Sequence, residues 1–379
     1  MDALTTPLPK TWQRVRLGDI CEIVKGQQIN KISLNNTDKY PVINGGIDFL
    51  GYTNKFNVSK NTIAISEGGT CGYVRFMKSD FWSGGHNYSL QKISNKVNNL
   101  CLYHILKSYE KDIMKLGVGS GLKNIQLKAL KDFEILLPPL NEQIAIANIL
   151  SDVDRYLYSL DALILKKESV KKALSFELLS QRKRLKGFNQ NWQKVRLGDI
   201  GKPCMCKRVM KHQTTPYGEI PFYKIGTFGN TADAFISKKL FLEYKAKYSF
   251  PKKGDILISA SGTIGRAVIY DGKPAYFQDS NIVWIDNDET LVKNDFLFYA
   301  YSNIKWNTEY TTILRLYNDN FRNTLIPLPP LNEQIAIANI LSDVDHEIIS
   351  LKNKKRQFEN IKKALNHDLM SAKIRVLNK

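Results

Sequence analysis

The longest regular pattern of hydrophobic and polar positions lies at residues 141–186. Hydrophobic side chains recur there at alternating spacings of four and three, then at spacings of four: Ile146, Leu150, Val153, Leu157, Leu160, Ile164, Val170, Leu174 and Leu178. This spacing predicts an amphipathic helix with a coiled-coil seam. Asn141 is expected to cap its start, and Gly187 to end it after Lys186. At 1.5 Å per residue, such a helix would be about 69 Å long.

A second seam lies in the last part of the chain and predicts a helix that runs almost to Lys379. Its hydrophobic positions are Ile337, Leu341, Val344, Ile348, Leu351, Phe358, Ile361 and Leu365. One long amphipathic helix is not stable alone in water, and two in one chain can pair. Antiparallel pairing is the simplest arrangement, because it returns the end of the chain towards its start.

An internal repeat relates the two halves. The segment LPPLNEQIAIANILSDVD occurs at 137–154 and, unchanged, at 328–345, an offset of 191 residues. A shorter box, WQRVRLGDI at 12–20, recurs as WQKVRLGDI at 192–200, an offset of 180. Each half therefore holds the same two motifs around a variable segment, and the second variable segment is 11 residues longer.

The variable segments predict two mixed α/β globules. Short strands alternate with Gly, Asn and Ser turns, and 61–76 and 254–269 both read as a strand, a Ser-to-Gly turn and a second strand. The predicted fold is α+β: two α/β globules with long helices in an antiparallel coiled coil, arranged as a pseudo-twofold dumbbell. The expected domains are 1–137 and 187–328, with helical spacers at 138–186 and 329–379.

Charge points to a polyanionic partner. The chain has 379 residues, with 55 Lys and Arg against 36 Asp and Glu, giving a net charge of +19. The globular segment 21–137 carries 15 basic and 9 acidic side chains, and 201–328 carries 17 and 12. A surplus of this size is typical of proteins that bind nucleic acid or an acidic membrane face.

Composition and termini predict a cytoplasmic protein. The first 20 residues show no apolar signal-peptide core, and no apolar run approaches the roughly 20 residues of a membrane span. Five scattered cysteines suggest free thiols in a reducing compartment. Cys204 and Cys206 with His212 could supply half of a zinc site, but no second ligand pair follows, so no metal is expected.

Polar turns of the two globules are the candidate DNA-reading sites. Asn, Gln, Arg and Lys reach base edges, and Lys and backbone amides position phosphates. The candidates are Lys25, Gln27, Gln28, Ser83, His86, Asn87, Ser120, Lys123, Asn124, Lys207, Arg208, Lys224, Arg266, Gln278, Asn281, Arg315, Tyr317 and Asn318.

The repeated helix starts are the candidate partner-docking sites. Their identity extends to positions outside the hydrophobic seam, which predicts that a shared partner docks twice. The candidates are Leu140, Asn141, Glu142, Gln143, Asn148, Leu331, Asn332, Glu333, Gln334 and Asn339. No phosphate-binding loop for ATP, no Asn-Pro-Pro-Tyr box for methyl transfer and no nucleophile or acid–base pair at useful spacing is present. The chain is therefore expected to recognise DNA without catalysing a reaction.

These motifs resemble the specificity subunit of type I restriction–modification systems. The resemblance rests on both LPPLNEQ-led helices, both WQxVRLGDI boxes and the strand–Gly-Thr–strand pattern. It implies two target-recognition domains, each reading half of a bipartite, asymmetric site on double-stranded DNA, with the helices setting the half-site spacing. It also implies two docked methyltransferase subunits and restriction/translocase subunits, with S-adenosylmethionine, ATP and Mg on those partners and no membrane.

Other functions remain open at this stage. One is the specificity subunit of a related two-chain restriction enzyme that cuts on both sides of its site. Another is a stand-alone coiled-coil DNA-binding repressor, although a homodimer would need only one helix repeat. A structural scaffold would leave the basic globules unexplained.

Overall fold

The structure, a computed structural model, describes residues 9–310 and 314–376 and divides into two compact units. Unit 1 comprises Met1–Ala162 with Asn353–Lys379, and unit 2 comprises Leu163–Lys352. Each unit thus combines one globule with parts of both long helices. The domain ends expected at residues 1 and 379 lie outside the described residues.

Unit 1 is built on two small sheets flanked by helices. A four-stranded sheet has the order β2-β8-β5-β6, and a three-stranded sheet has the order β4-β3-β7. Its elements before the long helix are β1 Gln13–Arg16, α1 Leu17–Ile20, β2 Glu22–Lys25, η1 Lys31–Ser33, β3 Tyr40–Ile43, β4 Gly51–Thr53, β5 Thr62–Ser66, β6 Val74–Met77, β7 Trp82–Ser83, β8 Asn87–Gln91, α2 Asn99–Ser108, α3 Glu110–Met114, β9 Gly117–Val118, β10 Asn124–Ile125, α4 Leu127–Lys131 and β11 Glu134–Leu137.

Unit 2 repeats this topology. Its sheets have the orders β13-β19-β16-β17 and β15-β14-β18. Its globular elements are β12 Gln193–Arg196, α6 Leu197–Ile200, β13 Gly201–Met205, η2 Lys211–Gln213, β14 Ile220–Tyr223, β15 Phe235–Ile236, α7 Lys238–Lys247, β16 Ile256–Ser259, β17 Ala267–Ile269, β18 Tyr276–Phe277, β19 Ile282–Asn287, α8 Asn294–Ala300, η3 Tyr301–Asn303, β20 Glu309–Tyr310, β21 Leu314–Arg315, α9 Asn318–Asn323 and β22 Leu325–Leu328.

The shared topology confirms the prediction of two copies of one α+β fold. The parallel pair β3–β7 has its counterpart in β14–β18, and the antiparallel pair β1–β11 in β12–β22. The main difference is α7, which lies in the long link between β15 and β16; unit 1 has no helix between β4 and β5. This link is where the second variable segment gains length.

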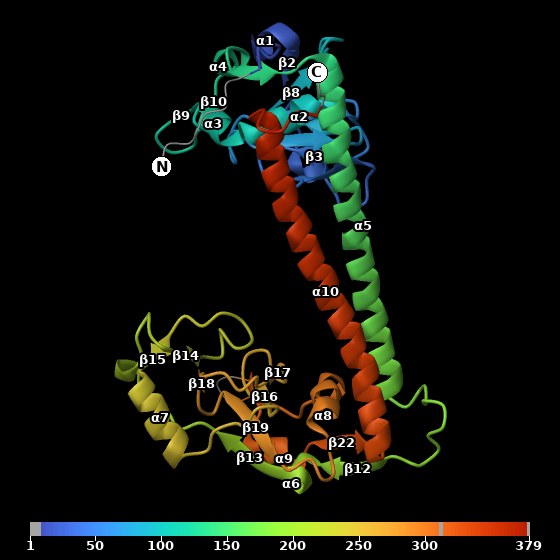
Figure 1. The fold of residues 1–379 in the computed structure, drawn as a ribbon, viewed down its shortest axis with the longest axis vertical. Coiled ribbons are helices and arrows are strands. Elements are labelled where there is room, and N and C mark those ends of the chain that lie inside the picture. Colours follow the sequence, from blue (N-terminus) through green and yellow to red (C-terminus); the bar gives the residue numbers. More distant parts are fainter. Residues whose placement is uncertain (1–8, 311–313, 377–379) are drawn as a thin grey trace. The chain divides into compact units, whose positions relative to one another are not determined.

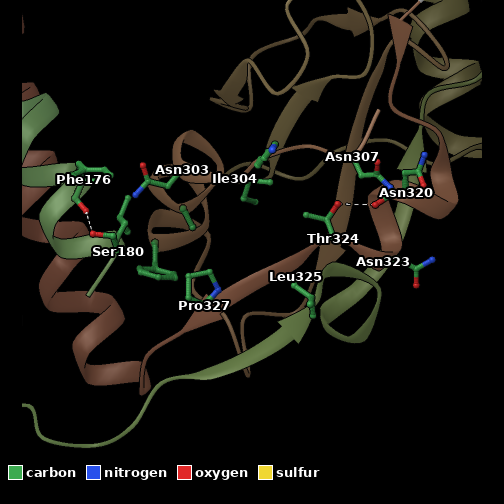
Figure 2. A pocket seen from close by; sticks show the side chains of 14 residues that line it. Phe176, Ser180, Asn303, Ile304, Asn307, Asn320, Asn323, Thr324, Leu325 and Pro327 are labelled. Atoms are coloured by element: carbon green, nitrogen blue, oxygen red, sulfur yellow. Dashed lines mark hydrogen bonds between the residues drawn. The ribbon is translucent and has the colours of Figure 1, made fainter. Parts of the chain in front are cut away.

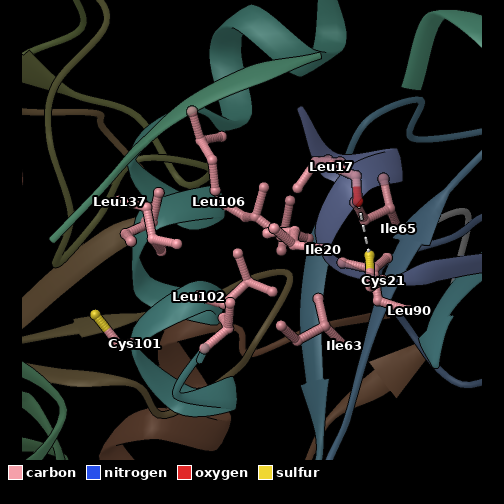
Figure 3. Packing of buried hydrophobic residues seen from close by; sticks show 14 of the residues in the cluster. Leu17, Ile20, Cys21, Ile63, Ile65, Leu90, Cys101, Leu102, Leu106 and Leu137 are labelled. Atoms are coloured by element: carbon pink, nitrogen blue, oxygen red, sulfur yellow. Dashed lines mark hydrogen bonds between the residues drawn. The ribbon is translucent and has the colours of Figure 1, made fainter. Parts of the chain in front are cut away.

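The core of unit 1 joins the four-stranded sheet to α1, α2 and the long helices. Leu17, Ile63, Ile65 and Leu102 are fully buried there, as Figure 3 shows. Ile146 and Leu150 of α5 and Leu369 of α10 pack into the same core, and α10 and α5 contribute Ile337, Leu341 and Leu178 to the core of unit 2 in the same way. Each globule is therefore held by the start of one long helix and the end of the other.

The long helices α5 (Leu140–Leu179) and α10 (Leu331–Met370) run antiparallel within each unit (Figure 1). In unit 1, Asp161 pairs with Lys355, and Asp154 with Lys362. In unit 2, Lys167 pairs with Glu347, and Lys171 with Asp345. In both units the partner number falls as the α5 number rises, which confirms the predicted antiparallel pairing.

Three predicted helix details are wrong. Helix α5 begins at Leu140, so Asn141 is its second residue and not its cap. The helices end at Leu179 and Met370, before Lys186 and Lys379, because Gln181 and Ala372 adopt positive φ angles of 61° and 56°. The amide of Lys183 then donates to the Glu177 carbonyl, and that of Ile374 to the Asp368 carbonyl, which closes the same turn in both copies.

Two predicted seam positions are also wrong. Val170 and Ile361 are 45% and 52% exposed. The next residue in each helix, Lys171 or Lys362, instead faces the other helix and pairs with an aspartate. A lysine with its ammonium group in an ion pair thus occupies the position expected for a hydrophobic side chain.

Candidate nucleic-acid interface

The candidate reading turns of unit 1 meet at the turn that follows β5. The amide of Glu67 donates to the His86 carbonyl at 2.8 Å, and the Glu67 carbonyl accepts from the Ile125 amide at 2.9 Å. The amide of Gly26 donates to the Asn87 carbonyl at 2.8 Å. Segments 25–28, 66–72, 83–87 and 117–125 therefore form one surface of four loops, although they are far apart in sequence.

A buried carboxylate organises this surface. Glu67 is 8% exposed, and its Oε1 accepts from Lys25 Nζ at 2.7 Å and from the Tyr88 hydroxyl at 3.1 Å. His86 Nδ1 lies 3.9 Å from its Oε2. Burial and the Glu67 charge raise the pKa of Tyr88 above its usual range, so its hydroxyl remains a donor. The side chains of Lys25 and His86 are both more than half exposed, and they thus lie at the edge of the four-loop surface.

The other candidate reading residues of unit 1 fall into an exposed group and a buried group. The side chains of Gln27, Gln28, Ser120, Lys123 and Asn124 are exposed. Ser83 and Asn87 are 0% and 2% exposed, and Ser83 Oγ and Asn87 Nδ2 have no partner among the described residues. These two positions act through the backbone: the Ser83 carbonyl accepts from the Gln27 amide at 2.8 Å.

Unit 2 builds the same frame with different side chains. The Ala260 amide donates to the Asn281 carbonyl at 2.8 Å, and the Ala260 carbonyl accepts from the Leu316 amide at 2.8 Å. Ala260 is therefore the counterpart of Glu67, and Asn281 the counterpart of His86. The acidic centre of unit 1 is absent from this position in unit 2.

The side chains of this second surface are held by their own contacts. Arg208 Nε donates to Asp279 Oδ2 at 2.8 Å. Arg315 Nη2 donates to the Ser280 carbonyl at 2.8 Å and to Asn281 Oδ1 at 3.3 Å, and Ser261 Oγ donates to the same Asn281 oxygen. The structure thus brings the predicted residues Asn281 and Arg315 into contact, and it places Arg208 against Asp279, two residues before Asn281.

The remaining candidates of unit 2 surround this cluster or lie apart from it. Gln278 accepts from the Ile225 amide through Oε1, and the Lys207 carbonyl accepts from the Tyr276 hydroxyl. Lys224 pairs with Asp233, and Arg266 reaches Asn230 at 3.5 Å. Tyr317 and Asn318 are exposed where α9 begins. None of these contacts joins Lys224 or Arg266 to the residues around Arg315.

Glycines fix the shared turn. Gly69 and Gly72 have φ of 70° and 83°, and Gly262 and Gly265, at matching places, have 65° and 82°. Side chains other than Gly are strained at such angles. The Gly-Thr-x-Gly pattern seen in both variable segments is thus the signature of this turn.

The repeated helix starts are buried junctions within each unit. Glu142 accepts from Trp12 Nε1 at 3.2 Å and from Arg375 Nε at 2.8 Å, and it is 2% exposed. In unit 2, Glu333 accepts from Trp192 Nε1 at 3.0 Å and from Arg184 at 2.9 Å through both Nε and Nη2. These roles of Trp and Arg were not predicted from the sequence, although offsets of 180 and 191 residues relate the two Trp and the two Arg positions.

The neighbouring glutamines make a second pair of junctions. Gln143 Nε2 donates to the Pro138 and Lys96 carbonyls, and its Oε1 accepts from the Asn98 amide at 2.7 Å. Gln334 makes the equivalent bonds to Pro329, Leu291 and Lys293. Internal bonding thus accounts for the identity of four of the ten docking candidates.

The other docking candidates lie on the surface. Leu140, Asn141 and Asn148 are exposed, and so are Leu331, Asn332 and Asn339. Ile144 and Ile335, on the same helix faces, are 43% and 42% exposed. We call Leu140, Asn141, Ile144 and Asn148, with their counterparts at Leu331, Asn332, Ile335 and Asn339, the paired stripes.

Removal of a junction carboxylate is expected to destabilise its unit. In Glu333→Ala, Arg184 and the Trp192 indole lose their buried acceptor, so we expect a loss of about 2–4 kcal/mol in the free energy of unfolding. Urea denaturation of the full chain measures this loss. Asn332→Ala, one residue earlier on the exposed face, is the matched control, with an expected change within about 0.5 kcal/mol. Equal losses in the two variants would contradict the junction role of Glu333.

Unit 2 contains a pocket of about 480 Å³. Its lining includes Phe176 and Ser180 at the end of α5, Asn303 at the end of η3, and Asn320 and Leu325 (Figure 2). None of the predicted reading or docking residues is among its lining residues. It belongs to neither the loop surface nor the paired stripes.

Further features concern metals and membranes. Within residues 9–310 and 314–376, no group of three His, Cys, Asp or Glu side chains could hold a metal ion. Cys206 is buried, and burial raises the pKa of its thiol to about 12. No helix in the described part of the chain has the length and apolar character that crossing a bilayer requires.

Two copies of one α+β frame with unlike side chains at equivalent loop positions define a protein with two related recognition surfaces. Comparison with known proteins gives the family. A model for the type I restriction modification DNA specificity domain matches residues 9–167 and, a second time, 189–360. The chain therefore belongs to the type I restriction–modification DNA specificity family.

Individual relatives agree with this membership. A Haemophilus influenzae protein whose assigned name is that of a type I restriction enzyme specificity subunit is 40% identical over 319 residues, which is 79% of this chain and 80% of the relative. A type I restriction enzyme specificity subunit of Methanocaldococcus jannaschii is 27% identical over 98% of this chain and 95% of its own length. The crystal structure of an S subunit from Mycoplasma genitalium has the same fold, with a TM-score of 0.66, 23% identity and coverage of 96% of this chain and 98% of that one.

Proposed function

We propose that each unit reads one half of a bipartite, asymmetric site on double-stranded DNA. The observation that carries this proposal is the shared loop frame: Glu67 and Ala260 make equivalent backbone bonds, while the side chains around them differ. Equal frames present two surfaces in equivalent ways, and unlike side chains select different bases. The net charge of +19 favours a polyanionic ligand.

We propose further that α5 and α10 set the distance between the half-sites. Antiparallel pairing within each unit, through Asp161–Lys355 and Lys167–Glu347, supports a stalk built from both helices. Helices in dimeric DNA-binding proteins fix half-site spacing in a comparable way. The number of unread base pairs would then follow the helix length.

The chemistry of the system is assigned to partners. The chain's role is recognition in the cytoplasm, while methyltransferase subunits hold S-adenosylmethionine and restriction/translocase subunits use ATP and Mg. One solved structure with this fold, at 15% identity and a TM-score of 0.53, comes from work described as the structural basis of complex assembly and conformational transition of the type I system. Its description makes assembly of this chain with partner subunits the natural expectation.

The paired stripes are the proposed methyltransferase docking sites. Each stripe places exposed Leu and Ile side chains beside two Asn side chains, and the two stripes have identical sequence and equal exposure. Apolar side chains with amides at their edges are suited to a protein partner. Two equal stripes predict two equal partners.

Substitution of the stripes is expected to remove the partners one at a time. Ile144→Asp should reduce the complex from two methyltransferase subunits to one, and Ile144→Asp with Ile335→Asp should abolish it, because a charge would be buried in each contact. Native mass spectrometry of the co-expressed complex counts the subunits. Tyr217→Asp, at a position that is 85% exposed, is the control and should retain both. Two subunits bound to the double variant would refute docking at the stripes.

A further inference from the structure

The two loop surfaces carry different hydrogen-bonding groups at equivalent positions. We propose that Arg208 and Arg315 read guanine in the half-site of unit 2, and that Gln28 and Asn124 read adenine in the half-site of unit 1. This inference rests on the proposed reading of half-sites and adds which residues select which bases.

Strand register makes Gln28 and Arg208 equivalent. Ser66 lies opposite Asn87 in the β5–β8 pair, and Ser259 opposite Ile282 in the β16–β19 pair. Tyr88 therefore corresponds to Val283. In the neighbouring strand pairs β2–β8 and β13–β19, Tyr88 lies opposite Lys25 and Val283 lies opposite Met205. Gln28 and Arg208 each lie three residues beyond those partners, on the chain that leaves the strand.

A shared backbone bond makes Asn124 and Arg315 equivalent. Each precedes the residue, Ile125 or Leu316, whose amide donates to the central carbonyl of Glu67 or Ala260. Each also lies beside the turn: a Cβ on Gly68 would meet Asn124 Oδ1 at 2.3 Å, and Arg315 bridges to Ser261, the counterpart of Gly68. Asn124 and Arg315 are therefore different side chains at the same position of a shared backbone frame.

The contacts of the arginines orient them as readers. Arg208 is 67% exposed, and its contact with Asp279 uses Nε, which is compatible with presenting the terminal nitrogens. Arg315 is half-buried and anchored through Nη2, which donates to two acceptors, so Nη1 is the terminal nitrogen that it can offer to a base. The two terminal nitrogens of Arg208 can donate to O6 and N7 of guanine together, and Nη1 of Arg315 can donate to one of these acceptors, whereas an Asn or Gln amide matches N6 and N7 of adenine. The replacement of Gln28 and Asn124 by arginine at the equivalent positions of unit 2 thus changes the preferred purine from adenine to guanine.

Arg-to-Lys exchange separates base reading from charge. Lysine keeps the positive charge but loses the planar fork that pairs with guanine. In Arg208→Lys and Arg315→Lys, each combined with the intact methyltransferase, we expect discrimination at one guanine position of the unit 2 half-site to fall roughly tenfold to hundredfold. The unit 1 half-site should be read unchanged. Single-molecule methylation sequencing of the host reports both halves at once.

Three further results decide the proposal. Arg182→Lys, at an exposed arginine in the turn after α5, should leave the motif unaltered. Asn124→Ala should relax one adenine position in the unit 1 half-site alone. A wild-type motif whose unit 2 half holds no guanine, or Lys variants that read the wild-type motif with full discrimination, would overturn it. A motif without two separate halves would instead refute the proposed function itself, and the two failures are therefore distinguishable.

Discussion

Replacing residues 21–136 with the matching segment of a family member of different specificity is expected to change one half-site completely. The segment carries all of the four-loop surface around Glu67 and leaves unit 2 untouched. Since β1 and the junction of Glu142 with Trp12 and Arg375 lie outside the exchanged segment, the new globule should dock on the same frame. Single-molecule methylation sequencing of a host that carries the exchanged chain measures the outcome.

The reciprocal exchange of residues 201–327 is the matched control. It should change the other half-site and retain the first, with the same unread gap in both experiments. A change in both halves after either exchange would show that the units do not read independently.

Lengthening both long helices is expected to widen the unread gap by one or two base pairs. Four residues added after Ala162 in α5 and four after Lys352 in α10 lengthen each helix by about 6 Å. Base pairs are about 3.4 Å apart. The paired insertion preserves Asp161–Lys355 on one side and Lys167–Glu347 on the other. Methylation sequencing reads the gap directly.

A four-residue insertion outside the helices tests whether length alone matters. Placed between Phe188 and Asn189, it should leave the gap unchanged, because these residues lie between α5 and β12. An unchanged gap after the paired helix insertion, in a chain that still directs methylation, would contradict the spacing role.

The sequence was sufficient to predict the duplicated fold and the antiparallel helices. Hydrophobic spacing at Leu160, Ile164 and Ile348 marks positions that are buried. The exact repeat at 137–154 and 328–345 marks helix starts that occupy equivalent places in the two units. Periodicity succeeds here because burial on one helix face imposes it.

The details that sequence analysis missed depend on long-range polar contacts. The bonds of Glu142 to Trp12 and Arg375 span 130 and 233 residues, so no local pattern announces them. Val170 and Ile361 were predicted for the seam because the adjacent lysines look like surface residues. Their ion pairs with aspartates of the other helix become visible only when both helices are placed.

The composition of the proposed reading surface was easier to predict from the sequence than the arrangement of its loops. Polar turns around Lys25, His86 and Asn124 do converge in unit 1, as they do around Arg315 in unit 2. Glu67, the buried acceptor between them, was not predicted, because an acidic residue does not by itself suggest DNA binding. Only its contacts show that it accepts a hydrogen bond from Lys25 and lies beside His86.

The most direct test of two unlike readers on one frame is the methylation motif of a host that carries this chain with its methyltransferase. We expect two short half-sites of different sequence, separated by a gap of fixed length. A single continuous motif, or two identical halves, would contradict it.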